Sequence, residues 1–168
     1  VDDKKLTKLN IKDAIENNAK VLENTKVINI EQSSSYWQIF LENNQVIKSK
    51  ILINASGPWI DETLQNVIKI NSKKKIRLVK GSHIITNKIY DEDVAFTLQN
   101  NDKRIIFVIP YKEKYSLIGT TEIEVNSPEK NSIDDSEITY LINCVNSYFN
   151  KQISKEDIVD TYSGIRPL

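Results

Sequence analysis

The sequence predicts an α+β protein, with a mixed α/β arrangement as the alternative. Two stretches, 26–53 and 76–125, contain short runs in which apolar and polar residues alternate, as half-buried strands require. Two others, 60–68 and 138–149, carry apolar residues at helical spacing. The composition is 39% hydrophobic and 27% charged with a formal net charge of zero, so nothing points to nucleic acid as a partner.

The N-terminal part predicts one weak helix and a small antiparallel sheet. Apolar residues fall near one face over 4–18, and strand-like runs follow at 26–30, 36–41 and 46–53. The turn Glu42–Gln45 contains two asparagines, which tolerate the positive φ of a tight hairpin. The apolar run Ile51–Ile53 predicts a buried strand end.

A helix is predicted directly after Gly57 and Pro58. Proline suits the first helical position, and the acidic Asp61 and Glu62 suit the positive N-terminal end. The apolar stripe of this helix runs over 60–68, and Lys73–Lys75 predicts a solvated loop after it.

The C-terminal part predicts a larger antiparallel sheet and one more helix. Turns at 100–102 and 112–114 indicate hairpins between neighbouring strands. Asp134 and Glu137 form a capping-box pattern before the stripe that ends at Phe149. A last strand is predicted over 158–163, followed by a tight turn in which Gly164 and Pro167 bracket Arg166. The strands of the sheet itself are expected at 77–85, 95–99, 104–109, 115–119 and 122–125.

Glycine occurs only at positions 57, 81, 119 and 164, so each placement is informative. Gly57 lies between an apolar run and a predicted helix, an arrangement that exposes backbone N–H groups to a phosphate. Many turns of this kind bind nothing, so the spacing alone leaves a nucleotide role open.

Two polar residues are candidates for chemistry. His83 is the only histidine, and it is either structural or a general base. Arg166, one of three arginines, forms either a surface ion pair or a bidentate clamp for carboxylate or phosphate. The single cysteine, Cys144, is interpreted as a buried structural thiol. No metal-ligand cluster is present in the sequence.

Six motifs follow one another along essentially the whole chain: Asn54–Trp59, Arg77–His83, Leu98–Asn100, Phe107–Tyr111, Ile118–Thr121 and Tyr162–Leu168. In this order they resemble the FAD-dependent, aerobic glycerol-3-phosphate dehydrogenase family. Ser56 stands where threonine is usual in the family, a change that keeps the hydroxyl. The Gly-rich pyrophosphate loop of such domains is absent from these residues, so the chain resembles an interior fragment.

The resemblance implies a partial FAD-binding domain over 1–67, a substrate-binding domain over 68–157 and a strand over 158–168 that returns to the FAD domain. It also implies that His83 and Arg166 line the substrate pocket, as base or hydroxyl-orienting group and phosphate ligand respectively. The cofactor-binding residues implied by the resemblance are Ala55, Ser56, Gly57, Pro58, Trp59 and Gly164.

The implied reaction is oxidation of sn-glycerol 3-phosphate to dihydroxyacetone phosphate, with hydride passing to FAD and electrons then to quinone. The expected location is cytoplasmic, or peripheral on the cytoplasmic face of the inner membrane, and a homodimer is left open. Two alternatives remain: a fragment of a related FAD-dependent amine or amino-acid oxidase, and a non-catalytic structural or binding fragment.

Overall fold

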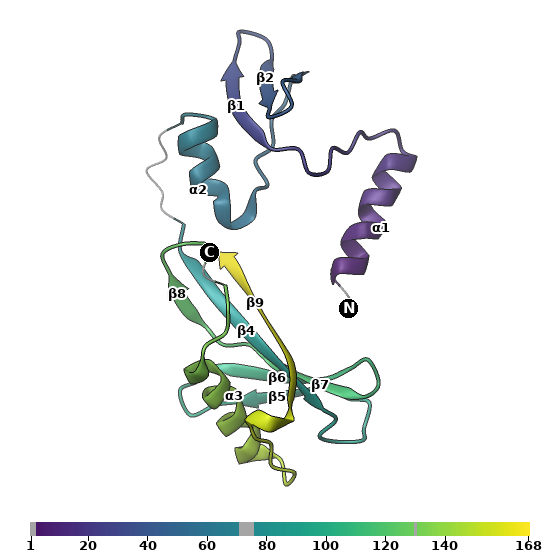
Figure 1. Cartoon of the computed structure of the whole chain (residues 1–168), viewed down its shortest axis with the longest axis vertical. Helices are drawn as coiled ribbons and strands as arrows, with labels where there is room; N and C mark the ends of the chain where they lie inside the picture. The colour runs from purple at the N-terminus through teal and green to yellow at the C-terminus, as the bar shows by residue number, and fades with distance from the viewer. Residues whose placement is uncertain (1–2, 71–75, 130) are drawn as a thin grey trace. The chain divides into compact units, whose positions relative to one another are not determined.

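The computed structural model describes residues 3–70, 76–129 and 131–168 (Figure 1). The chain divides into two compact units. The first comprises Val1–Asn54 with Glu62–Asn71, and the second comprises Ala55–Asp61 with Ser72–Leu168. The expected loop at Lys73–Lys75 lies outside the described residues. None of the described helices has the length and apolarity that a bilayer crossing requires.

The first unit contains a helix and a three-stranded antiparallel sheet. Helix α1 spans Asp3–Glu16 and has no buried residue. Strands β1 (Val27–Gln32), β2 (Trp37–Leu41) and β3 (Val46–Ser49) pair in sequence order. The predicted hairpin turn is confirmed, and Asn44 adopts φ 64° within it. A small core of Ile30, Ile39 and Leu41 lies under this sheet.

The predicted buried strand end at 51–53 is wrong. Strand β3 stops at Ser49, whose hydroxyl donates to the carbonyl of Ile51 at 2.7 Å. Ile51 and Ile53 are 73% and 82% exposed, because no strand among the described residues pairs with them. Apolar character alone does not bury a segment that lacks a partner strand.

The helix predicted after Pro58 forms in three short pieces. Residues Gly57–Trp59 are a 3₁₀ turn (η1) with Pro58 near its start, Ile60–Glu62 are α-helical (α2), and Thr63–Val67 are a π turn (η2). Gly57 has φ 56°, the left-handed region that glycine occupies without strain. Because the segment forms no long helix, it has no strong helix dipole to attract a phosphate.

The second unit is built on a six-stranded antiparallel sheet (Figure 1). Strand β4 (Leu78–Asn87) is its centre: β9 (Ile158–Pro167) runs along one side, and β7 and β8 pair with its two halves on the other. The remaining strands are β5 (Phe96–Gln99), β6 (Ile105–Tyr111), β7 (Tyr115–Gly119) and β8 (Ile123–Val125).

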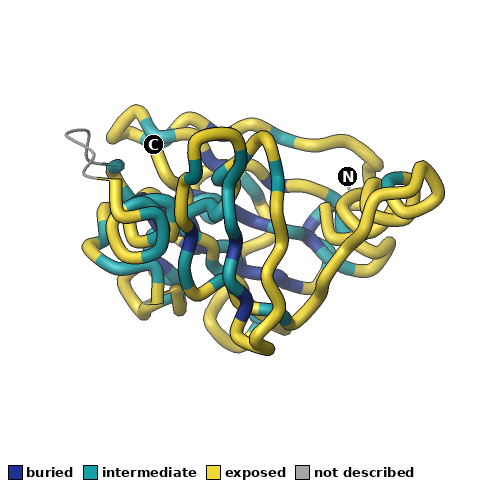
Figure 2. Tube along the Cα trace, turned by 90° about the horizontal axis from the view of Figure 1, so that it is seen from above, coloured by how far each residue is buried: buried dark blue, intermediate teal, exposed yellow. Residues whose placement is uncertain are grey.

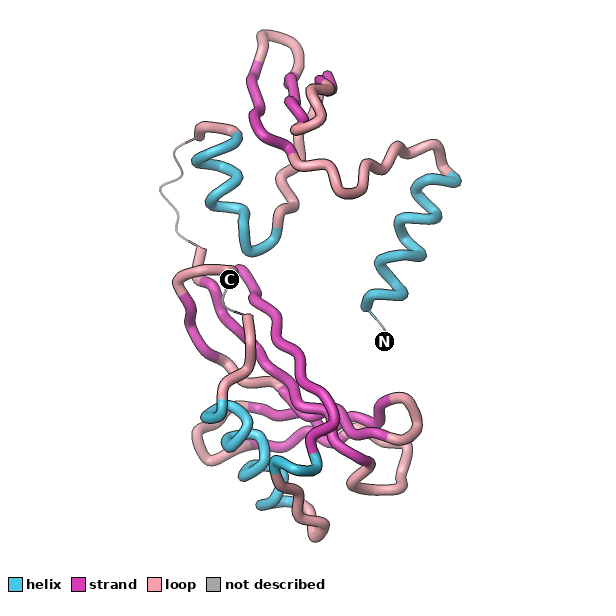
Figure 3. Tube along the Cα trace, in the orientation of Figure 1, coloured by secondary structure: helices cyan, strands magenta, loops and turns pink. Residues whose placement is uncertain are grey.

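One face of this sheet is covered by helix α3, Asp135–Tyr148, as Figure 3 shows. Asp134 caps the helix, and the predicted capping box with Glu137 is confirmed. The main core lies between helix and sheet, where buried positions alternate with more exposed ones along the strands (Figure 2). Its fully buried side chains include Ile84, Ile106, Val108, Ile118, Leu141 and Val145. The predicted antiparallel sheet, its helix and the α+β class are thus confirmed.

The C-terminal strand is longer than predicted. Strand β9 continues through Gly164 and Arg166 to Pro167, so Arg166 lies in a strand and not in a tight turn. Proline at the last position of a strand donates no hydrogen bond to the ladder, which is tolerated at a strand end. Because β9 pairs with β4, the compact units do not follow the boundaries at 67 and 157. Which segments serve cofactor or substrate stays a prediction.

A short 3₁₀ turn, η3 (Lys155–Asp157), leads into β9 and carries its own capping box between Ser154 and Asp157. Cys144 is buried in α3, as predicted, and burial raises the pKa of its thiol above the ordinary range. No group of three or more metal-ligating side chains occurs in the described part of the chain.

Candidate functional site

The two faces of β4 carry different chemistry because side chains alternate across a strand. Lys80 and Ser82 lie on the face toward α3, while Gly81 and His83 lie on the opposite face. We call the second face, which also carries Val79 and Ile85, the His83 face.

The register of β9 places its site residues on this same face. Tyr162 pairs with His83, Gly164 with Gly81, and Arg166 with Val79. Directly paired residues of antiparallel strands share a face, so His83, Gly164 and Arg166 are brought together from distant parts of the sequence.

Gly81 lies beneath the Arg166 guanidinium. A Cβ built at Gly81 would lie 3.2 Å from Arg166 Nη2 and 2.4 Å from Thr120 Oγ1. Any side chain at position 81 would therefore displace Thr120 and crowd Arg166. Gly81, in the motif Arg77–His83, therefore leaves space for the side chains of Thr120 and Arg166.

The imidazole of His83 is partly buried and electrostatically perturbed. Burial, and secondarily the Arg166 guanidinium, lower the pKa of His83 below its ordinary value of 6.5. A neutral imidazole at neutral pH is able to accept a proton. Its Nδ1 atom is buried and has no hydrogen-bond partner in the described part of the chain.

The predicted cofactor residues Ala55–Trp59 belong to the second unit, and η1 contacts β9, the strand of Gly164 and Arg166. Trp59 is 45% exposed, and its indole Nε1 donates to Glu129 Oε1 at 3.2 Å. Gly57 and Gly164 have open space around them, because an added Cβ would meet no atom within 4 Å. Packing within this chain therefore does not demand glycine at 164, which fits the close approach of a flat cofactor ring to the backbone.

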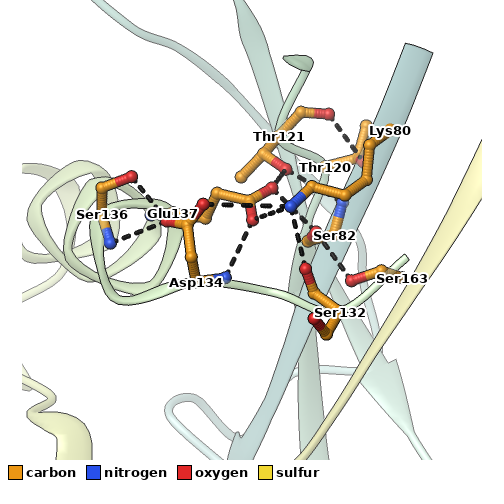
Figure 4. Close-up of polar contacts among 9 residues, drawn as sticks. All are labelled: Lys80, Ser82, Thr120, Thr121, Ser132, Asp134, Ser136, Glu137 and Ser163. Carbon is orange, nitrogen blue, oxygen red and sulfur yellow. Dashed lines mark hydrogen bonds and ion pairs between the residues drawn. The ribbon is translucent and has the colours of Figure 1, made fainter. Parts of the chain in front are cut away.

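The opposite face of β4 carries a buried ionic network that sequence reasoning missed. The Nζ atom of Lys80 lies 2.7 Å from Glu137 Oε2, with the two side chains 8% and 1% exposed. Figure 4 shows Glu137 at the centre of the network, reached from both β4 and α3. Thr121 and Ser82 donate to Glu137 Oε1 at 2.6 and 2.8 Å. Lys80 therefore points away from the His83 face, although it belongs to the same motif.

A cavity of about 250 Å³ opens on this helix-covered side of the sheet. Its lining includes Glu137 but none of the predicted site residues. The lining residues are Arg104, Thr121, Ile123, Ser136, Glu137 and Tyr140. Because the Glu137 carboxylate is already satisfied by the network, we assign the cavity no ligand.

Sequence reasoning also missed the role of Tyr162 and the reason for Gly119. The Tyr162 ring stacks on His83, and an added Cβ at Gly119 would overlap the same imidazole. Strict alternation along β4 could have separated Lys80 from His83. Nothing local in the sequence reveals the pairing partner of His83 on β9.

Comparisons with known proteins identify the family of this chain. The family described as FAD dependent oxidoreductase (DAO) matches residues 1–168. Aerobic glycerol-3-phosphate dehydrogenase of Escherichia coli is 38% identical over 100% of this chain and 35% of its own length. D-erythritol 1-phosphate dehydrogenase of Brucella abortus is 37% identical with the same coverage. The chain spans about a third of the length of these curated relatives.

Solved structures show the same fold. A glycerol-3-phosphate dehydrogenase from Bacillus halodurans, complexed with FAD, superposes with a TM-score of 0.81 at 24% identity, covering 94% of this chain and 33% of that one. L-alpha-glycerophosphate oxidase from Mycoplasma pneumoniae, with FAD bound, gives 0.74 at 17% identity, covering 92% and 41%. With the family match over its whole length, this chain belongs to the FAD dependent oxidoreductases.

Proposed function

We propose that the protein containing this chain oxidises sn-glycerol 3-phosphate to dihydroxyacetone phosphate with FAD as the cofactor. The observation that carries the proposal is the shared face of His83, Gly164 and Arg166, which unites a neutral base, an open backbone position and a fixed cation. The glycerol-3-phosphate dehydrogenases of Escherichia coli and Pseudomonas aeruginosa, 38% and 39% identical to this chain, support the substrate. We call the protein that contains these residues the parent protein.

FAD fits the residues present, since Gly164 and the turn Ala55–Trp59 would lie against it without displacing any atom near the two glycines. When bound, FAD supplies a two-electron acceptor for the hydride that leaves C2 of the substrate.

In this proposal His83 takes the proton of the C2 hydroxyl. Its lowered pKa keeps the imidazole neutral at pH 7, which is the form a general base requires. The proton and the hydride together account for the two hydrogens removed when the alcohol becomes a ketone.

Arg166 binds the phosphate of the substrate. A guanidinium offers paired N–H donors that match two phosphate oxygens, whereas a lysine ammonium offers only a point charge. The guanidinium lies over Gly81, two positions before His83 on the same strand, so phosphate and hydroxyl would be held at neighbouring points of one face.

A second candidate substrate is D-erythritol 1-phosphate. The Brucella abortus dehydrogenase of that compound is 37% identical to this chain, nearly as similar as the glycerol-3-phosphate dehydrogenases. Both compounds are polyol phosphates, so Arg166 and His83 would serve either one. Erythritol 1-phosphate has one more CHOH group than glycerol 3-phosphate, and the site would have to accept that group.

The test compares two variants of the parent protein on four substrates: glycerol 3-phosphate, erythritol 1-phosphate, unphosphorylated glycerol and glycine. His83→Asn should lower kcat by about 10²–10⁴-fold with a smaller change in KM. Arg166→Lys should lower kcat/KM for the phosphates by about 10- to 100-fold, and much less for glycerol. Unchanged turnover in His83→Asn would show that His83 is structural, and glycine oxidation in place of alcohol oxidation would favour an amine or amino-acid oxidase.

We propose further that electrons pass to quinone and that the parent protein is cytoplasmic or associates peripherally with the cytoplasmic face of the membrane, with a homodimer as one assembly. These proposals follow from the same resemblance, as does the division into cofactor segments at 1–67 and 158–168 around a substrate domain. Quinone reduction by membrane vesicles that contain the parent protein would test the acceptor.

A further inference from the structure

Four residues from four strands form one row across the His83 face. Phe107 pairs with Gly119, Gly119 with His83, and His83 with Tyr162. The two neighbours of His83 in this row are therefore a residue without a side chain and an aromatic ring. We propose that Gly119 and Tyr162 are positioning residues that fix the imidazole of His83 in one orientation. The catalytic consequence rests on the function proposed above for His83; the orientation itself does not.

The Tyr162 ring constrains the imidazole from one side. The ring centroids are 4.6 Å apart and the planes differ by only 9°, which is a parallel stack. Tyr162 is 46% exposed, so its ring lies on the surface of the sheet and not in the buried core. Stacked planar groups resist rotation of one ring against the other, so the stack defines the plane of the imidazole.

Gly119 leaves room for the imidazole on the side of β7. A Cβ built at Gly119 would lie 2.2 Å from His83 Cδ2, 2.6 Å from Cγ and 2.8 Å from Nε2. The imidazole thus occupies the space that a side chain at position 119 would fill. Only glycine at this position of β7 allows the ring to lie over the neighbouring strand.

These two contacts orient the imidazole, a role that a hydrogen bond usually has. A general-base histidine is commonly oriented by a third group that accepts a hydrogen bond from its second nitrogen. Here Nδ1 has no such partner in the part of the chain that the structure describes. Stacking on Tyr162 and the space over Gly119 replace that hydrogen bond in orienting the ring.

The test uses the fact that His83 is the only histidine, so its imidazole gives a single set of NMR signals in the 168-residue chain. The variants are Tyr162→Leu, which removes the ring, and Tyr162→Phe, which keeps it. Tyr148→Leu is the matched control, because Tyr148 is an exposed tyrosine on α3, on the other side of the sheet. Gly119→Ala is a second probe from the opposite side.

We expect the stacked ring to shift the His83 ring protons upfield in the unmodified chain and in Tyr162→Phe. Tyr162→Leu should remove that shift, and Tyr148→Leu should not. In the parent protein, Tyr162→Leu should lower kcat by about 10- to 100-fold with little change in KM, and Tyr162→Phe should restore most of it.

Unchanged His83 signals in Tyr162→Leu would overturn the proposal, as would a Tyr162→Phe variant as impaired as Tyr162→Leu. If Gly119→Ala fails to fold, the two Tyr162 variants still decide. One result separates the positioning of the ring from its catalytic role. In that result the His83 signals change in Tyr162→Leu, while turnover is normal in both Tyr162→Leu and His83→Asn. In that case Gly119 and Tyr162 position the ring, and the proposed catalytic role of His83 is wrong.

Discussion

At the scale of single residues, glycine determines where the polar groups of the His83 face can lie. Gly81 leaves room for Arg166 and Thr120, and Gly119 leaves room for the imidazole of His83. Gly164 differs, because a Cβ there would meet nothing. Two of these three glycines thus leave room for neighbouring side chains, while the third has open space beside its backbone.

The lowered pKa of His83 gives the first residue-scale prediction. Burial comes first among its causes and Arg166 second, so Arg166→Gln should raise the pKa of His83 without restoring the value of 6.5. NMR titration of the single histidine measures this directly. Arg104→Gln is the control, since Arg104 pairs with Asp102 and is not among the causes of the shift. An identical titration in Arg166→Gln would place Arg166 too far away to act on His83.

The same shift fixes the sign of a contribution to stability. The unfolded chain binds the imidazole proton near pH 6.5, before the folded chain does. Stability from neutral His83 is therefore complete above pH 6.5 and is lost as the pH falls from there through the folded pKa.

At the scale of elements, the Lys80–Glu137 pair joins the N-terminus of α3 to the centre of β4. Glu137 also accepts from the Asp134 backbone, which ties the helix cap to the same carboxylate. Burial alone would raise the pKa of Glu137, but the hydrogen bonds from Lys80, Thr121, Asp134 and Ser82 outweigh it and lower the pKa below 4.5. This contribution to stability is present above pH 4.5 and is lost as the pH falls through the folded value.

Removing one partner of this pair should destabilise the chain strongly. Glu137→Gln leaves the buried Lys80 ammonium with only the Asp134 carboxylate, 3.9 Å away and half exposed, as a counter-charge. Breaking a buried pair in this way typically costs about 3–5 kcal/mol. Asp135→Asn is the matched control on the same helix: its 2.8 Å pair with Lys155 is exposed, and such pairs contribute about 0–1 kcal/mol. Urea unfolding at pH 7 measures both. Equal losses of unfolding free energy in the two variants would mean that the buried network stabilises the chain no more than a surface ion pair does.

The elements were largely predictable, and their long-range pairing was not. Alternation and turn residues located the strands and the hairpins, and the capping box located the start of α3. The prediction that residues 51–53 are buried failed because burial depends on a partner strand, which no local pattern reveals. Glu137 was recognised only as a capping residue, since its partner Lys80 comes from a strand far away in sequence.

At the candidate site, too, the residues could be predicted from the sequence but their spatial pairing could not. His83 and Arg166 were singled out because both residue types are rare in this chain. Their shared face depends on the register of β9 against β4, which the sequence does not reveal. The expected tight turn at Arg166 was wrong because glycine and proline, which often mark turns, also occur in edge positions of strands.

At the scale of the whole molecule, the cofactor segments within this chain are incomplete for phosphate binding. Its four glycines lie at 57, 81, 119 and 164, and no three of them form the Gly-rich loop that receives a pyrophosphate. In the proposed site the turn Ala55–Trp59 and Gly164 would contact FAD, and neither is a Gly-rich loop. Compact units that fold around their own cores can therefore exist without retaining the cofactor.

We accordingly expect the purified 168-residue chain to be colourless, while the parent protein carries FAD. A hydrogen bond to a charged phosphate contributes about 1.5–3 kcal/mol, so two or three missing bonds weaken binding by on the order of 10²–10⁶-fold. The absorbance spectrum after dialysis measures the flavin content of each. Gly164→Ala refines the test: it should reduce flavin content in the parent protein but leave unfolding of the chain unchanged, since the added Cβ meets no atom within 4 Å. A stoichiometric flavin spectrum in the dialysed chain would show that these residues suffice, and equal flavin content in Gly164→Ala would remove Gly164 from the cofactor site.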